Sequence, residues 1–239
     1  MAEHTEGVKT AGSGDAETLR EVYDRSSERY DLKRLNDPYK RAFDARERRL
    51  LRHHLQETGR ALEVGAGTGR LTDELLGVAD EVLAVDLSPG MLGQLRDKHP
   101  DEPRLRTQIG DVFSLHEVPG YGTFDAVLSM RMVPHLERIE DALEQLAGAV
   151  RPGGRLMFDF WNPRSYTYRK KRKAKAFIRY VDAREAKALV AGAGLELERL
   201  TGAGFKSPWL RDLEFLGSTP LWRYGWSLVA LCRRPGAPH

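Results

Sequence analysis

The sequence predicts an α/β protein with a doubly wound, largely parallel sheet behind an N-terminal helical cap. From Arg60 onward, short apolar runs alternate with amphipathic segments, which is the pattern of βαβ units. The first of these runs leads directly into a glycine-rich turn at 65–69, as in nucleotide-binding α/β sheets. The chain has 239 residues, a length that suits one such domain with some additions.

Seven apolar runs qualify as strands, with helical segments between them. The helix near 89–98 is the most clearly marked, because Ser88 can cap it and Pro89 occupies the first turn, where no amide hydrogen is needed. We expect helices also near 70–78, 137–149 and 183–192. The expected strands are 61–64, 81–85, 104–110, 124–130, 154–160, 195–202 and 224–233.

The chain divides into three parts. Residues 1–17 are polar and lack apolar periodicity, so we expect a disordered lead-in. Residues 18–58 carry two helical patterns and form the expected cap, and the remaining 59–239 form one domain with a basic insertion at about 162–180. The second helix of the cap has an apolar stripe that consists of Phe43, Leu50, Leu51 and Leu55.

The composition limits the classes of protein to which this chain can belong. Apolar residues make up 41% and charged residues 31%, as in ordinary globular domains. No apolar run approaches the roughly 20 residues of a membrane span, and the first residues lack a secretory signal, so we expect a cytoplasmic protein. Cys232 is the sole cysteine, which excludes an internal disulfide. Because no His, Asp or Glu cluster has metal-ligand spacing, we expect no metal site.

The segment ALEVGAGTGRL at 61–71 is a buried strand followed by a glycine turn. Gly65, Gly67 and Gly69 allow a sharp turn and a close approach of backbone to a ligand. Arg70 stands where the dinucleotide pattern G-x-G-x-x-G requires its third glycine, which disfavours a pyrophosphate site without excluding it.

Two acids follow the next two strands. Asp86 can accept hydrogen bonds from both ribose hydroxyls of a nucleoside, with a helix-capping or solvated loop acid as the alternative. Asp111 can accept from an adenine amino group, with a plain turn residue as the alternative. Together with the glycine turn, these positions indicate a nucleoside-binding edge of the sheet.

Five stretches in this order resemble the class I S-adenosylmethionine-dependent methyltransferases, in particular the small-molecule branch with the ubiquinone and menaquinone C-methyltransferases and natural-product N- and O-methyltransferases. They are EVGAGTGRL, VLAVDLSPGML, IGDVFSL, FDAVLSMRMVPHL and VRPGGRLMFDF, which together span about 60–160. The resemblance implies a Rossmann-like seven-stranded sheet with an antiparallel last strand. It also implies S-adenosylmethionine as cofactor and S-adenosylhomocysteine as product.

The resemblance further implies which residues contact the cofactor. Tyr23 or Tyr30 would close over its methionine end, or would merely pack a helix on the domain. The other implied contacts are Glu63, Gly65, Ala66 and Gly67 at the methionine part, Asp86 and Leu87 at the ribose, Met91 and Val112 on the adenine faces, Asp111 at the adenine amino group, and Met130.

Methyl transfer from a sulfonium needs nucleophile, methyl carbon and sulfur in line, so positioning and exclusion of water can supply most of the catalysis. An amine acceptor needs no strong base, whereas a hydroxyl acceptor would profit from one. His135, just past the fourth strand, is the best placed candidate, although similar proteins carry a histidine there without using it as a base. Arg131 is a candidate contact for an anionic substrate group and Trp161 for the acceptor pocket.

The stretch 164–179 contains eight Lys or Arg residues and no acid. It could follow a phosphate backbone, form a lid over an acidic small molecule, or be a solvated helix face. Against a nucleic-acid base methylase stand the missing Asn/Asp-Pro-Pro-aromatic motif and the missing cysteine nucleophile. The sequence therefore predicts methyl transfer to N or O of a small-molecule acceptor. RNA or protein methylation, or cofactor binding without methylation, are the alternatives, and the oligomeric state stays open.

Overall fold

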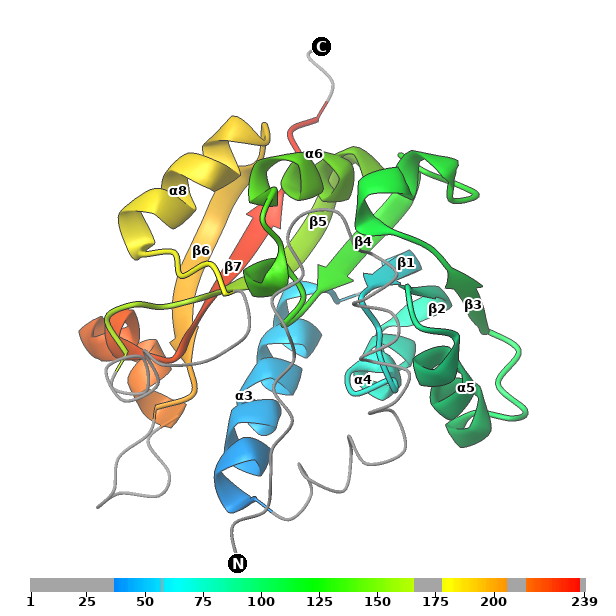
Figure 1. Ribbon diagram of the computed structural model, residues 1–239, viewed down its shortest axis with the longest axis horizontal. Coiled ribbons are helices and arrows are strands. Elements are labelled where there is room, and N and C mark those ends of the chain that lie inside the picture. Colours follow the sequence, from blue (N-terminus) through cyan, green and yellow to red (C-terminus); the bar gives the residue numbers. More distant parts are fainter. Residues whose placement is uncertain (1–36, 57, 166–177, 206–213, 237–239) are drawn as a thin grey trace, which may run out of the picture.

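A seven-stranded sheet forms the centre of the computed structural model, which describes residues 37–56, 58–165, 178–205 and 214–236 (Figure 1). The strand order is β3-β2-β1-β4-β5-β7-β6. β7 runs antiparallel to both of its neighbours, and the other adjacent pairs are parallel, so the predicted fold class is confirmed. The strands are β1 Thr58–Val64, β2 Ala79–Asp86, β3 Leu105–Ile109, β4 Phe124–Ser129, β5 Val150–Trp161, β6 Glu196–Ala203 and β7 Ser227–Arg233.

Helices cover both faces of the sheet. On one face lie α6 (Ile139–Ala149) and α8 (Ala183–Gly192), and on the other α3 (Pro38–His54), α4 (Thr72–Leu76) and α5 (Pro89–Lys98) (Figure 1). Four short 3₁₀ turns complete the described elements, namely η1 Val112–Glu117, η2 Val133–His135, η3 Glu214–Ser218 and η4 Pro220–Tyr224.

Alternate strand residues build two hydrophobic cores. Leu62 and Val64 of β1 join the core under α6 and α8, whereas Ala61 joins the core under α3 and α4. The predicted apolar stripe of α3 is buried in the second core, with Leu51 and Leu55 fully inside. The helix therefore packs directly on the sheet.

The predicted boundaries agree with the structure where a local signal is strong. α5 and α8 span the predicted residues, and Ser88 caps α5 by accepting from the backbone N–H of Met91 at 3.0 Å. α4 is shorter than the predicted 70–78, because the glycine turn extends further into this segment. β7 begins at Ser227 and not at 224, because η4 occupies the preceding residues. The first helix of the cap and the lead-in lie outside the described residues, so the domain boundaries stay a prediction.

The strand order reverses between β1 and β4, whose carboxyl ends adjoin. In open α/β sheets, ligands bind beyond the carboxyl ends of the strands at such a switch point. The glycine turn follows β1, and the segment with Arg131 and His135 follows β4. The topology thus brings the two most informative sequence segments to one edge of the sheet.

Candidate cofactor and acceptor site

The glycine turn after β1 has the backbone that only glycine adopts readily. Gly65, Gly67 and Gly69 have φ values of 71°, 57° and 82°. A Cβ on Gly65 would lie 2.9 Å from the Cβ of Met132, so this glycine is needed for contact with the segment after β4. A Cβ on Gly67 would meet nothing within 4 Å, so the backbone here faces open space. A ligand can therefore approach the chain closely at Gly67.

Asp86, the last residue of β2, lies against this turn. Its Oδ2 accepts a hydrogen bond from the backbone N–H of Gly67 at 2.7 Å, and its Oδ1 accepts from that of Ser88 at 2.9 Å. A carboxylate oxygen has two lone pairs, so each can accept a further hydrogen bond. The acid is thus fixed beside the open glycine, in the place from which a ribose would be held.

Glu63, two residues before the turn, is buried. Its Oε2 accepts from Oγ1 of Thr72, the first residue of α4, at 2.6 Å. Burial raises the pKa of Glu63 to about 7, although the hydrogen bond from Thr72 and the nearby Arg70 oppose the shift. The side chain joins the end of β1 to the helix that follows the turn, which gives it a structural role in addition to the expected cofactor contact.

The residues expected around the adenine follow β2 and β3. Asp111 caps η1, where its Oδ1 accepts from the backbone N–H of Phe113 at 3.0 Å, so the turn role is present. Asp111 and Leu87 are half-buried. Val112, Met91, Ala66 and Met130 are buried. Tyr23 and Tyr30 lie outside the described residues.

The segment after β4 begins with a strained residue. Arg131 has φ 64° and is the only non-glycine residue with positive φ in the part of the chain that the structure describes. Its backbone N–H donates to Oδ1 of Asp159 at 2.5 Å, and Oδ2 of Asp159 accepts from Oγ of Ser227 at 2.7 Å. Asp159 is fully buried, and burial raises its pKa to about 6.

The guanidinium of Arg131 lies among acids of α3. Its Nη2 is 2.9 Å from Oδ1 of Asp44 and 2.8 Å from Oε2 of Glu47, and Nη1 of Arg70 contacts the same two carboxylates at 3.2 and 2.5 Å. We call these four residues the ion cluster. Arg131 was expected to contact an anionic substrate group, but here the carboxylates of α3 occupy its guanidinium. The cluster ties α3 to the glycine turn and to the segment after β4.

Aromatic side chains gather beside this segment. The rings of His135 and Trp161 meet edge to face with centroids 5.0 Å apart. Trp161 also contacts Trp226 at 5.3 Å and Tyr180 at 6.2 Å, and Trp226 contacts Phe43 at 5.8 Å. These five residues are the aromatic cluster. It lies where β5 ends and β7 begins, so the predicted acceptor residues His135 and Trp161 are in contact.

Two parts of the site were not found from the sequence. Asp159 sits inside the apolar run GRLMFDF, and a charged residue within a buried strand was the available signal. The ion cluster gave no signal, because its two arginines, Arg70 and Arg131, lie far in the chain from each other and from the acids of α3 with which they pair. In the basic stretch, Arg179 pairs with Glu140 and Glu185, and 166–177 lie outside the described residues.

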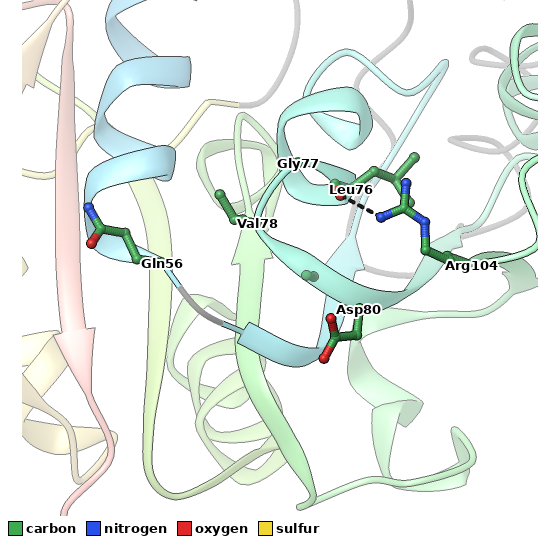
Figure 2. Close-up of a pocket in the computed structure, with 7 residues that line it drawn as sticks. Gln56, Leu76, Gly77, Val78, Asp80 and Arg104 are labelled. Atoms are coloured by element: carbon green, nitrogen blue, oxygen red, sulfur yellow. Dashed lines mark hydrogen bonds between the residues drawn. The ribbon is translucent and has the colours of Figure 1, made fainter.

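A pocket of about 490 Å³ lies at the amino end of β2. Figure 2 shows the residues that line it. Nη1 of Arg104 donates to the carbonyl oxygen of Leu76 across it at 3.0 Å. The predicted site residues are absent from its lining, which consists of Gln56, Leu76, Gly77, Val78, Ala79, Asp80 and Arg104. The pocket is therefore separate from the candidate site.

Among the described residues, no group of three or more His, Cys, Asp or Glu side chains is arranged to hold a metal ion. In the same part of the chain, no helix has the length and apolar character needed to cross a membrane.

Comparisons with known proteins find similarity to methyltransferases. Residues 62–158 match a family model described as a methyltransferase domain. Over 227 residues the chain is 31% identical to the malonyl-[acyl-carrier protein] O-methyltransferase of Halorhodospira halophila, and the match covers 87% of this chain and 74% of that protein. It is also 31% identical over 113 residues to the ubiquinone biosynthesis O-methyltransferase of Burkholderia multivorans, which covers 46% of this chain and 47% of that protein. The chain spans less than half the length of this and several other curated relatives.

Among solved structures, the N-methyltransferase NodS of Bradyrhizobium japonicum, in complex with S-adenosyl-L-homocysteine, matches with a TM-score of 0.65 at 18% identity. The match covers 90% of this chain and 98% of that one. At this identity the likeness is one of fold.

Proposed function

Because the chain belongs to the family of S-adenosylmethionine-dependent methyltransferases, we propose that it methylates a nitrogen or oxygen atom of a small molecule. S-adenosylmethionine is the cofactor, and S-adenosylhomocysteine is the product formed from it. The acceptor would lie beyond the carboxyl ends of β4 and β5, beside His135 and Trp161.

One observation carries this proposal. The segment after β4 contacts the glycine turn through Met132, which packs on Gly65, and contacts the aromatic cluster through His135, which packs on Trp161. Only two residues of chain therefore lie between a contact with the glycine turn and a contact with the aromatic cluster. A molecule held at the aromatic cluster would be a close neighbour of one held at the turn, as in-line transfer requires.

The cofactor fits the residues that surround the turn. Open space above Gly67 would receive the methionine part, and Asp86 would hold the ribose hydroxyls from beside it. When bound, the cofactor supplies an activated methyl group, so the chain itself has to bind, orient and exclude water. Asp111 with Val112 and Met91 would take the adenine, and Leu87 and Met130 would add apolar contacts.

The chemistry of the acceptor decides what His135 does. A carboxylate or an uncharged amine has an available lone pair, and the imidazole would then only shape the site. A hydroxyl acceptor loses a proton, and His135 would be the base that takes it. The named O-methyltransferase relatives favour an oxygen acceptor, and one of them acts on a malonyl group carried by a protein. The aromatic cluster favours acceptors with an apolar or planar part.

The proposal is tested by transfer of a deuterium-labelled methyl group from S-adenosylmethionine to separated cell fractions. The small-molecule fraction, malonyl-acyl carrier protein, RNA and the remaining protein are each incubated with the full chain and analysed by mass spectrometry. We expect the label in the small-molecule fraction. Label in RNA or in protein side chains would contradict the proposal. Label on the malonyl group would show that the methylated small molecule is attached to a carrier protein.

A further inference from the structure

We propose that Asp159 is a positioning residue for methyl transfer. It holds the strained backbone at Arg131 so that the segment after β4 contacts both the glycine turn and the acceptor. The inference deepens the proposed function and rests on it, because the segment in question is the one assigned to the acceptor side. Asp159 lies in β5, next to β4 in the sheet, and is well placed to act on the end of β4.

The backbone at Arg131 needs an external hold. A left-handed φ of 64° is unfavourable for a residue with a Cβ, and such a conformation persists only where the surroundings determine it. The surroundings here are a carboxylate, since the N–H of Arg131 donates to Oδ1 of Asp159 at 2.5 Å. A hydrogen bond to a charged acceptor is stronger than one to a neutral group.

The other oxygen of Asp159 fixes the carboxylate itself. Oδ2 accepts from Oγ of Ser227, the first residue of β7, and the whole Asp159 side chain is withdrawn from solvent. The guanidinium of Arg70 and the imidazole of His135 act on Asp159 in the direction opposite to burial and lower its pKa. Burying a carboxylate is costly, as the raised pKa of Asp159 reflects. The presence of an acid in this buried position agrees with a role other than stability.

The backbone conformation at Arg131 sets the positions of side chains that contact three neighbouring parts of the structure. Met132 packs on Gly65 of the glycine turn, and the guanidinium of Arg131 contacts Asp44 and Glu47 of α3. His135 follows after one 3₁₀ turn and contacts Trp161. If Arg131 leaves the left-handed region, Met132 and His135 move together. The binding of cofactor should therefore depend on Asp159, although Asp159 itself is buried behind the turn.

The test measures the affinity for S-adenosylhomocysteine by calorimetry and the unfolding midpoint in urea for variants of the full chain. Asp159→Leu fills the space without an acceptor for the Arg131 N–H, and we expect affinity to fall about tenfold. Asp159→Asn keeps an acceptor for Arg131 and a donor for Ser227, and we expect affinity within about twofold of the parent. Ser227→Ala releases the other oxygen of Asp159, and we expect a smaller loss of affinity, about threefold. Thr58→Val, the matched control, removes a buried hydrogen bond to the carbonyl oxygen of Leu55 at the amino end of β1 and should lower the midpoint without changing affinity.

Two further variants address the strain directly. Glycine adopts a positive φ unaided, so Arg131→Gly in the Asp159→Leu background should recover affinity to the level of Arg131→Gly alone. If folded Asp159→Leu binds like the parent, the proposal is overturned. If Asp159→Leu fails to fold, the decision passes to Ser227→Ala, and a folded Ser227→Ala protein that binds like the parent would overturn the proposal. A parent that does not bind S-adenosylhomocysteine would instead overturn the proposed function.

Discussion

The backbone N–H of Gly67 donates to Oδ2 of Asp86 across 2.7 Å, which joins the turn after β1 to the end of β2. The bond holds the acid next to the glycine whose outer side is open. Two sequence features, one after β1 and one at the end of β2, are thereby held together. The pair is the most direct place to test the assignment of the cofactor site.

Replacement of Asp86 by Ala should weaken the binding of S-adenosylhomocysteine by at least about tenfold, because two hydrogen bonds from ribose to a charged acceptor, each worth about 1.5 to 3 kcal/mol, would be lost. Calorimetry of the parent and the variant gives the two dissociation constants. Asp101→Ala, at an exposed position, is the control and should leave binding unchanged. A folded Asp86→Ala protein that binds like the parent would show that the ribose lies elsewhere.

The ion cluster predicts a large stability effect at one acid. Glu47 is fully buried and pairs with both Arg70 and Arg131. Glu47→Gln keeps the shape but leaves two mostly buried guanidinium groups with Asp44, so we expect the free energy of unfolding to fall by about 3 kcal/mol. Glu140→Gln, which breaks the exposed pair with Arg179, should cost less than about 1 kcal/mol. Urea unfolding of both variants checks this, and equal effects would contradict a structural ion cluster.

Glu63 predicts how stability depends on pH. Its folded pKa of about 7 lies above the ordinary value of 4.5, so between these values the folded chain binds more protons than the unfolded chain. The contribution of Glu63 is therefore greatest below about pH 4.5 and is lost as pH rises toward 7, by a free energy of the order of 3 kcal/mol. Glu63→Gln should be more stable than the parent at pH 8, and the difference should shrink toward pH 5. Urea unfolding across this range would contradict the assignment if the difference stayed constant.

The sequence predicted most of the sheet because strands and caps are local signals. The seven apolar runs correspond to the seven strands, and Ser88 with Pro89 located the start of α5. Asp86 and the glycine turn were found because both follow a strand and share the carboxyl edge by topology. These inferences need only the period of the pattern and the rule that parallel strands end together.

The arrangement around Arg131 could not be predicted in this way. Asp44 and Arg131 are 87 residues apart, and nothing local indicates that acids of α3 pair with an arginine of the segment after β4. Arg131 was named as a candidate contact for a substrate anion because it lies two residues past Ser129, at the mouth of the fourth strand, and its ion pairs with α3 gave no signal in the sequence. Its left-handed backbone also carried no signal, since glycine is the residue that normally marks a positive φ.

The basic stretch separates the small-molecule proposal from RNA methylation, because the two respond differently to salt. In the test variant, uncharged residues replace Lys170, Lys171, Arg172 and Lys173 together. We expect its affinity for S-adenosylhomocysteine to be unchanged, because these residues follow β5 in the chain whereas the glycine turn follows β1. RNA binding through phosphates would make the logarithm of affinity fall steeply with that of salt concentration, and the variant would reduce the slope by about 3 to 4 units. Filter binding of a mixed RNA pool at several ionic strengths measures both slopes. We expect weak binding and a shallow slope in the parent. A steep slope with sub-micromolar affinity at physiological salt would replace the small-molecule acceptor by RNA.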